Sequence, residues 1–304
     1  MKILVVGSSN IDMIAQVDHL PVPGETVGNA KFIQAYGGKG ANQAVAAARL
    51  GGEVTFITSL GNDLYSQALI KHFNNENIIT KYIKVDSELS TGVALIFVAS
   101  NAENCIAVAP GANYALLPAK VESLESLIKD SDIVVMQAEI PYKTISDVAL
   151  LAHKNKVKVL FNPAPACQID PELIQKIDIL VLNEVEAETV SGKSLKDHTI
   201  EAIAVDLLNR GAKNVVITLG KEGVYLRTCN NSCKVPAFKV KAVDTTAAGD
   251  TFCGALAVAC AREEVDEKAL QFACAASAIT VTKMGAQPSI PKKEEVVKFL
   301  KNNL

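Results

Sequence analysis

Short, mainly apolar segments recur along this chain, and most are separated by enough residues to form a helix. The segments lie at 2–7, 54–60, 133–136, 157–162, 179–182 and 215–218, and helical patterns such as 64–75 stand between them. Apolar runs of this length are typical of strands buried on both faces, and strands that alternate with helices pair in parallel through crossover connections. The spacing therefore predicts a three-layered α/β fold with a mostly parallel, doubly wound central sheet.

Polar residues follow the carboxyl ends of several predicted strands. Asn10 and Asp12 come after the first strand, and the later strands are followed by Glu139, Asn162, Asn183 and Thr218. Open α/β sheets bind ligands at this edge, so we expect the ligand crevice there. Asp12 could accept hydrogen bonds from two neighbouring hydroxyls, as a sugar would require. It could equally stabilise a turn, and the residues alone leave both readings open.

Composition narrows the class of protein. A chain of 304 residues that is 49% hydrophobic can bury a large core. No apolar run approaches the roughly 18 residues of a membrane span, and the N-terminus has no signal-peptide pattern. The net charge of −3, without a basic cluster, argues against nucleic acid as a partner. Seven scattered cysteines fit a cytoplasmic, reduced protein.

The stretch 243–255 combines very small residues with one carboxylate. A predicted strand at 238–243 precedes it, and an apolar helix at 254–261 follows it. At Ala247, Ala248 and Gly249, the lack of side-chain bulk lets backbone N–H groups reach an anion at a helix N-terminus. Asp250 then either caps the helix or takes a proton from a hydroxyl that attacks a bound phosphate.

A second glycine-rich turn opens an alanine-rich helix at 37–51. It places Lys39 and Asn42 near the helix start, where a lysine opposes the helix dipole and is better explained by an anionic or polyhydroxyl ligand. The chain has no Walker A loop, and the first strand is not followed by the G-x-G-x-x-G spacing of a dinucleotide site.

Two further motifs have both a structural and a functional reading. Asn183 can cap a helix whose first turn carries Glu186, or the pair can orient magnesium-bound water, because Mg²⁺ keeps several waters and needs few protein ligands. The segment from Thr218 through Gly220 to Gly223 is either a plain turn or a surface for a nucleotide.

Together the stretches 37–51 and 243–255 resemble the two signatures of the ribokinase-like sugar kinase family. The resemblance runs from Val5 to the C-terminal helix and includes 23–26, 90–98 and 285–289. It implies one domain over 1–304 with a β-sheet lid inserted at about 12–36 and 88–112. The implied reaction is ATP-dependent phosphorylation of D-ribose at its 5-hydroxyl.

The resemblance also implies a role for each matching residue. Asp250 would be the general base, and the N–H groups of Ala247, Ala248 and Gly249 would stabilise the transferred phosphoryl group. The sugar would be held by Asn10, Asp12, Gly38, Lys39, Asn42 and Glu139. ATP and Mg²⁺ would face Asn183, Glu186, Thr218, Gly220, Gly223, Ala248 and Gly249.

A potassium site and a dimer follow from the same resemblance. Asp244 and the Gly- and Pro-containing loop 283–289 offer one carboxylate and several free carbonyls, which suit a large, weakly charged cation better than Mg²⁺. The matching ligands are Asp244, Thr246, Thr280, Lys283, Gly285 and Ser289, although Asp244 could instead merely cap its turn. Exposed strand edges in the lid, with apolar Val93, Leu95 and Phe97, predict a homodimer through the lid.

Three rival functions remain open at this stage. A nucleoside kinase of the same fold would need aromatic side chains near the lid, and few are there. A ketose or ketohexose-acid kinase lies closer, but Asn10, Asp12, Lys39 and Asn42 favour ribose. A sugar sensor without catalytic activity would have no need of Asp250.

Overall fold

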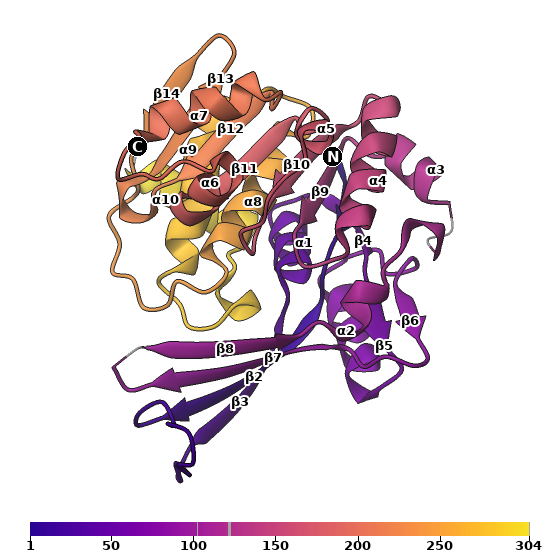
Figure 1. Ribbon diagram of the computed structural model, residues 1–304, viewed down its shortest axis with the longest axis vertical. Coiled ribbons are helices and arrows are strands. Elements are labelled where there is room, and N and C mark those ends of the chain that lie inside the picture. The colour runs from indigo at the N-terminus through magenta and orange to yellow at the C-terminus, as the bar shows by residue number, and fades with distance from the viewer. Residues whose placement is uncertain (102, 121–122, 304) are drawn as a thin grey trace.

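The computed structural model describes residues 1–101, 103–120 and 123–303, and within them the chain builds a large sheet, a smaller four-stranded sheet and a two-stranded pairing (Figure 1). The larger sheet has eight strands in the order β14-β13-β12-β11-β10-β9-β1-β4. Their bounds are β1 (Lys2–Val6), β4 (Glu53–Ile57), β9 (Ile133–Gln137), β10 (Lys158–Asn162), β11 (Ile179–Asn183), β12 (Asn214–Thr218), β13 (Val224–Thr228) and β14 (Ser232–Val235). The six neighbouring strands from β4 to β12 pair in parallel. β13 pairs antiparallel with β12 on one side and with β14 on the other.

Helices cover both faces of this sheet because alternate strand residues point in opposite directions. Val5 lies in the hydrophobic cluster of one face, whereas its neighbour Leu4 lies in that of the other. The first face is covered by α1 (Lys39–Arg49), α2 (Leu64–Asn75), α8 (Ala248–Cys260), α9 (Glu267–Thr280) and α10 (Lys293–Asn303). The second is covered by α3 (Leu124–Lys129), α4 (Tyr142–Lys154), α5 (Pro171–Ile174), α6 (Glu184–Ser191) and α7 (Ile200–Asn209).

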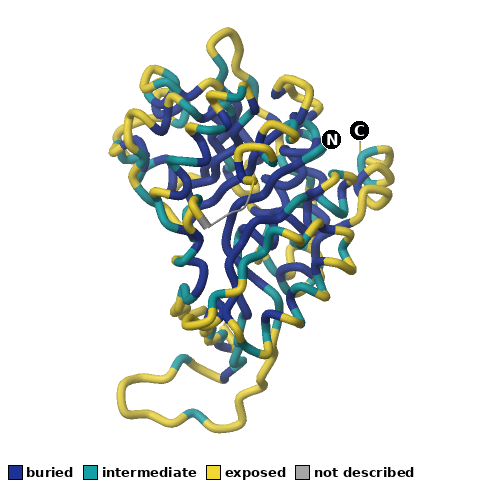
Figure 2. The backbone as a smooth tube through the Cα atoms, turned by 90° about the vertical axis from the view of Figure 1, so that its right-hand side faces the viewer, coloured by how far each residue is buried: buried dark blue, intermediate teal, exposed yellow. Residues whose placement is uncertain are grey.

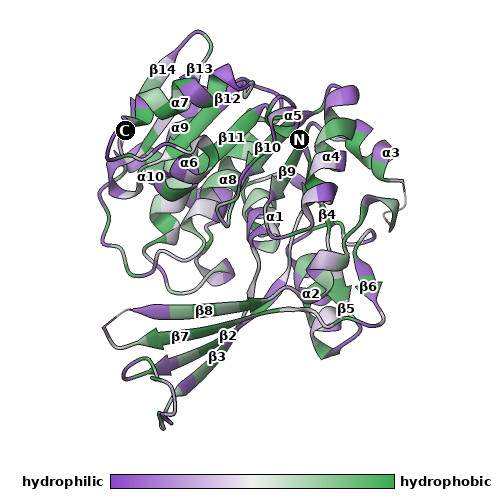
Figure 3. Cartoon of the chain, viewed as in Figure 1, coloured by the Kyte–Doolittle hydropathy of each residue, from purple (hydrophilic) through white to green (hydrophobic). Residues whose placement is uncertain are grey.

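The central strands are hydrophobic along their length, as Figure 3 shows in green. Strands buried between two helical layers have no solvent-facing side, so the absence of polar alternation in the sequence has a direct structural cause. The three layers predicted from the strand spacing are therefore present.

The smaller sheet has four strands in the order β3-β2-β7-β8, and we call it the lid sheet. The strands are β2 (Asn10–Val17), β3 (Lys31–Gly37), β7 (Gly92–Ala99) and β8 (Asn104–Ala109). They come from both predicted lid segments, although residue 102 within 88–112 lies outside the described residues. The lid sheet projects from the lower end of the molecule, where Figure 2 shows a largely exposed backbone.

Short elements complete the described chain. A two-stranded pairing joins β5 (Ser59–Gly61) to β6 (Lys84–Asp86), and four 3₁₀ turns are η1 (Gly111–Ala115), η2 (Pro118–Lys120), η3 (Gly220–Glu222) and η4 (Gln287–Ser289). No helix within the described ranges is long and apolar enough to cross a membrane.

The strand predicted at 238–243 is wrong. The sheet ends with β14 at Val235, and the next residue, Pro236, has no N–H to donate to a sheet ladder. The apolar side chains that follow serve other surfaces: the Phe238 ring packs edge-to-face on Phe299, with ring centroids 5.2 Å apart. The backbone N–H of Val243 donates to the Val281 carbonyl at the end of α9, at 2.7 Å. The turn before α8 therefore follows a loop, not a strand.

Candidate active site

Polar side chains meet at the carboxyl edge of the central sheet, as the strand ends predicted. Gln137 at the end of β9 is the register partner of Asn162 on β10, and Asn183 on β11 is the partner of Thr218 on β12. The order of the sheet reverses at β1, which lies between β4 and β9. Ligands of open α/β sheets bind at such a reversal.

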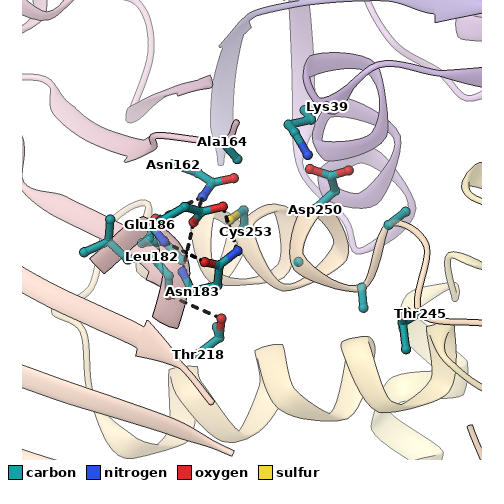
Figure 4. A pocket seen from close by; sticks show the side chains of 14 residues that line it. Lys39, Asn162, Ala164, Leu182, Asn183, Glu186, Thr218, Thr245, Asp250 and Cys253 are labelled. Atoms are coloured by element: carbon teal, nitrogen blue, oxygen red, sulfur yellow. Dashed lines mark hydrogen bonds between the residues drawn. The ribbon is translucent and has the colours of Figure 1, made fainter. Parts of the chain in front are cut away.

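Asp250 lies in the first turn of α8 and is almost fully buried, with 7% of its surface exposed. Its Oδ2 accepts a hydrogen bond from Asn42 Nδ2 at 2.9 Å, and its Oδ1 accepts one from Gln43 Nε2 at 3.1 Å. The N-cap residue of α8 is Ala247, and no side chain caps the helix. Asp250 is therefore not a helix cap; Figure 4 shows its carboxylate facing Lys39.

The turn before Asp250 presents backbone N–H groups to a small cavity of about 220 Å³. Ala247 has a left-handed conformation with φ 59°, which turns the chain sharply into α8. Within the described residues the N–H groups of Ala247 and Gly249 have no hydrogen-bond acceptor, whereas that of Ala248 donates to the Thr245 carbonyl at 3.2 Å. Of the three donors predicted for an anion, two are thus free.

Lys39 begins α1 on the opposite wall of this cavity. The nearby Asp250 carboxylate raises the pKa of its ammonium group, so the group stays charged. Gly38 precedes it with φ 87°, and a side chain there would collide with the backbone of Ser9 and Asn10. The close approach of these two segments requires a glycine at 38.

Glu139 holds the start of α1 in place. Its Oε2 accepts hydrogen bonds from the backbone N–H of Lys39 at 3.0 Å and from Ser8 Oγ at 2.5 Å. An acidic group at a helix N-terminus is favourable for the helix dipole, which explains the position in structural terms. The carboxylate keeps acceptor capacity on its other oxygen.

Asp12 lies on β2 at the root of the lid sheet, with its carboxylate against Gly37, where a side chain would overlap it. Burial, together with the negative charges of Glu139 and Asp250, raises the pKa of Asp12 from 3.8 to about 7. The predicted sugar ligands Asp12, Glu139 and Lys39 therefore act on one another electrostatically.

Asn10 is held by a residue that the sequence did not reveal. Asn113, in η1, is 1% exposed; its Nδ2 donates to Asn10 Oδ1 at 2.7 Å, and its Oδ1 accepts from the Ser9 N–H at 2.9 Å. No motif surrounds Asn113, and its partners lie about a hundred positions away in the chain. Gln43 and Gln137 were also missed because their partners are distant: Gln43 is 94 positions from Gln137 and 207 positions from Asp250.

Asn183 and Glu186 form a capping box at the start of α6, so the structural reading of this motif is correct. The Glu186 carboxylate accepts from the Asn183 N–H at 2.9 Å and from Asn162 Nδ2 at 3.1 Å, as the dashed lines in Figure 4 trace. Burial raises the pKa of Glu186. Both residues also line the cavity, so capping and ligand binding do not exclude one another.

A larger and more apolar cavity of about 710 Å³ adjoins the first. Asn183, Thr218, Thr245, Ala248 and Gly249 line both cavities, so the turn before α8 lies where the two meet. The larger cavity is further lined by Gly220, Gly223, Phe238, Cys274 and Val281. Its volume is in the range of small-molecule sites.

Asp244 connects the turn before α8 with the loop after α9. Its Oδ2 accepts from the Gly285 N–H at 2.8 Å, and its Oδ1 accepts from the N–H and hydroxyl of Thr246. Partial burial opposes ionisation, but these hydrogen bonds hold the pKa of Asp244 below its ordinary value. Of the predicted potassium ligands, Asp244, Thr246 and Gly285 are thus in direct contact. In the described chain Thr280, Lys283 and Ser289 make no hydrogen bond to Asp244.

Comparison with known proteins gives consistent matches over nearly the whole chain. A family model described as pfkB family carbohydrate kinase matches residues 1–293. The ribokinase of Haemophilus influenzae is 43% identical over 299 residues, which are 98% of this chain and 98% of that protein.

Solved structures agree with the described fold. A crystal structure of ribokinase from Thermotoga maritima has 43% identity and a TM-score of 0.91, with 99% of each chain covered. A structure of Arabidopsis thaliana ribokinase complexed with ribose and ATP has 32% identity and a TM-score of 0.91, and the match covers 99% of this chain and 98% of that one. The α/β fold with a separate small sheet, predicted from the sequence, is confirmed.

Proposed function

Because the chain belongs to the pfkB family of carbohydrate kinases, we propose that it transfers the γ-phosphoryl group of ATP to the 5-hydroxyl of D-ribose. The named relatives support ribose as the sugar and ATP as the donor. The single observation that carries the chemistry is the buried Asp250 carboxylate, fixed by two amides beside a turn with free N–H groups.

In this reaction Asp250 accepts the proton of the 5-hydroxyl as its oxygen attacks the γ-phosphorus. The bond from that phosphorus to the bridging oxygen breaks, and ADP leaves with the electron pair. The free N–H groups of Ala247 and Gly249, with Ala248 between them, face the charge that develops on the phosphoryl oxygens. The Lys39 ammonium adds a positive charge from the opposite wall of the cavity (Figure 4).

The sugar is held by polar groups from the central sheet, α1 and the lid sheet. Asp12 and Glu139 accept from hydroxyls, and Lys39 donates; the Nδ2 atoms of Asn10 and Asn42 are also donors. The backbone at Gly38 lies close enough for direct contact because no side chain intervenes.

The nucleotide belongs in the larger cavity, with its phosphates at the shared wall. One side of this cavity would contact the ribose and phosphates of ATP, and it is lined by Thr218, Gly220 and Gly223. Glu186 and Asn183 both line the smaller cavity, and this carboxylate and amide would offer few direct ligands, which fits a Mg²⁺ ion that keeps most of its waters. Bound there, the ion would neutralise charge on the phosphate oxygens.

We extend the proposal to K⁺ at Asp244 and its loop, to a homodimer through the lid sheet, and to the cytoplasm as the site of action. The described cysteines are all free thiols, which fits a reducing compartment.

Replacing the base tests the mechanism. Asp250→Asn retains shape and loses the proton acceptor, so kcat should fall by about 10²–10⁴, while ATP affinity changes little. Asp147→Asn, the same change on the surface of α4, is the control and should behave as the parent. Coupled release of ADP measures both. A kcat for Asp250→Asn within a few-fold of the parent would remove Asp250 from the mechanism.

A substrate panel tests the sugar. Each buried polar group left without its hydroxyl costs roughly 1–3 kcal/mol, so kcat/KM should be highest for D-ribose and lower for 2-deoxyribose, ketoses and hexoses. Equal efficiency on a hexose or on adenosine would refute ribose. A complete lack of phosphorylation with retained sugar binding would point instead to a sensor.

A further inference from the structure

The two amides that hold the Asp250 carboxylate come from consecutive residues of α1. Asn42 donates to Oδ2 and Gln43 donates to Oδ1, so each carboxylate oxygen keeps one lone pair for other partners. Consecutive helical residues both reach Asp250 because α1 and α8 approach closely at Gly254. A side chain at Gly254 would collide with Ala46 and with the Gln43 carbonyl.

Gln43 is oriented by a second amide behind it. Its Oε1 accepts a hydrogen bond from Gln137 Nε2 at 2.7 Å, which leaves its Nε2 to face Asp250. The side chain is 0% exposed and lines neither cavity. Gln43 therefore does not touch a bound substrate, and its polar groups are directed at protein atoms alone.

The same amide also reaches the nucleotide side of the site. Gln43 Nε2 lies 3.4 Å from Asn162 Oδ1, and Asn162 Nδ2 donates in turn to Glu186 Oε2 at 3.1 Å. All three side chains are buried, so their hydrogen bonds are shielded from water. Gln43 thus connects two carboxylates of the site, because it donates to Asp250 directly and reaches Glu186 through Asn162.

We propose that Gln43 is a positioning residue for phosphoryl transfer. Its amide holds the Asp250 carboxylate with a lone pair toward the cavity and links its position, through Asn162, to Glu186. This inference rests on the proposed role of Asp250 as the base. A glutamine that merely fills the core would stabilise the fold without affecting how Asp250 takes a proton.

The variant Gln43→Met removes the amide and keeps the length of the side chain. A hydrogen bond to a charged group is strong, so kcat should fall about ten- to a hundred-fold in Gln43→Met. The KM for ATP should change by less than about twofold. Donors to a carboxylate favour its charged form, so the acid limb of the pH–rate profile should move to higher pH. Gln271→Met on the surface of α9 is the matched control and should leave both unchanged.

A double-mutant cycle separates positioning from general stability. If Gln43 acts through Asp250, Gln43→Met should change the residual rate of Asp250→Asn by less than about twofold. An equal loss in both backgrounds, or a parental kcat with an unmoved acid limb in Gln43→Met, would overturn the inference. Should Gln43→Met fail to fold, Gln43→Asn decides, because it keeps an amide but withdraws it from Asp250 and should show the same losses.

The cycle also distinguishes this inference from the proposed function. An Asp250→Asn variant with parental turnover would refute the base itself. An inactive Asp250→Asn beside an unaffected Gln43→Met and Gln43→Asn would leave the base in place and refute only the role of Gln43.

Discussion

At the scale of single residues, Asp12 is the group whose chemistry depends most on its surroundings. It stands at the root of the lid sheet, and burial with two nearby carboxylates raises its pKa to about 7. In the sugar-free enzyme it is therefore partly protonated near neutral pH. Only the ionised form offers acceptors on both oxygens to the hydroxyls of a sugar.

This predicts a pH-dependent affinity for ribose. As the pH falls through 7, Asp12 gains a proton and loses an acceptor, so KM for ribose should rise about tenfold from about pH 8 to about pH 6. Initial rates at saturating ATP measure it. Asp12→Asn should bind more weakly throughout and show no such rise. A parental KM that is constant over this range would contradict the role of Asp12.

The same shift has a consequence for folding. Asp12 has a pKa of 3.8 when unfolded and about 7 when folded. Between these values the folded state keeps a proton that the unfolded chain has lost, so the contribution of Asp12 to stability falls as the pH rises through this window. In thermal unfolding without sugar, Asp12→Asn should remove this part of the pH dependence.

The sequence predicted some site residues and not others, for a physical reason. Asp250, Lys39 and Asn42 lie in glycine- and alanine-rich turns whose composition itself indicates a ligand. Gln43 follows Asn42 directly in α1, but its partner Asp250 is 207 positions away in the chain. Nothing in the neighbouring sequence distinguishes it from a glutamine on a helix surface. Asn113 likewise acts only through distant partners, which are the backbone of Ser9 and the side chain of Asn10.

At the scale of elements, the start of α8 depends on the loop after α9. The N–H groups of Val243 and Asp244 both donate to the Val281 carbonyl, and Asp244 accepts from the Gly285 N–H. The loop continues to Gln287, whose Nε2 donates to Asn42 Oδ1 at 3.2 Å. A cation bound by this loop would therefore order both the anion-binding turn and an amide that contacts the base.

We accordingly expect potassium to activate the enzyme. Activity in K⁺ should clearly exceed that in an inert organic cation of equal ionic strength, because the ion orders the N–H groups before the reaction. Asp244→Ala should abolish this response and keep a residual rate, whereas Asp147→Ala on the surface of α4 should keep the response. Identical rates in both cations would remove the proposed site.

The elements were largely predictable, and the exception at 238–243 is informative. Runs such as 133–136 and 179–182 became buried strands because only two-sided burial suits them. Apolar and polar residues alternate at 238–243, and this pattern has two possible causes. The segment can be a strand in a sheet with one solvent-exposed face, or a loop that covers a cavity. The segment becomes a strand only if it can hydrogen-bond along the edge of a sheet. Pro236 follows β14 directly and has no N–H to donate to such a ladder.

At the scale of the whole molecule, the lid sheet leaves much apolar surface exposed. Leu95 on β7 is 47% exposed, Ile106 and Val108 on β8 are 54% and 52% exposed, and Phe32 on β3 is 66% exposed. β3 and β8 are the edge strands of the lid sheet. Exposed apolar strands with free edges favour pairing with another sheet, and a second copy of this chain offers the complementary surface.

We therefore expect a homodimer through the lid sheet. Light scattering at micromolar concentration should give twice the mass of the chain. Leu95→Lys should shift the equilibrium toward monomer, because it places a charge in the interface. Leu150→Lys, at a leucine that is 55% exposed on α4, should not. A monomeric parent protein at this concentration would count decisively against the dimer.

The amides around Asp250 also determine the route by which a proton can leave it. Asn42 and Gln43 both turn N–H groups toward the carboxylate, and their oxygens accept from Gln287 and Gln137. Lys39, the facing cation, has no acceptor. Within the described chain this wall thus offers no acceptor for that proton, so the base must give it to water or to a phosphate oxygen of a departing product.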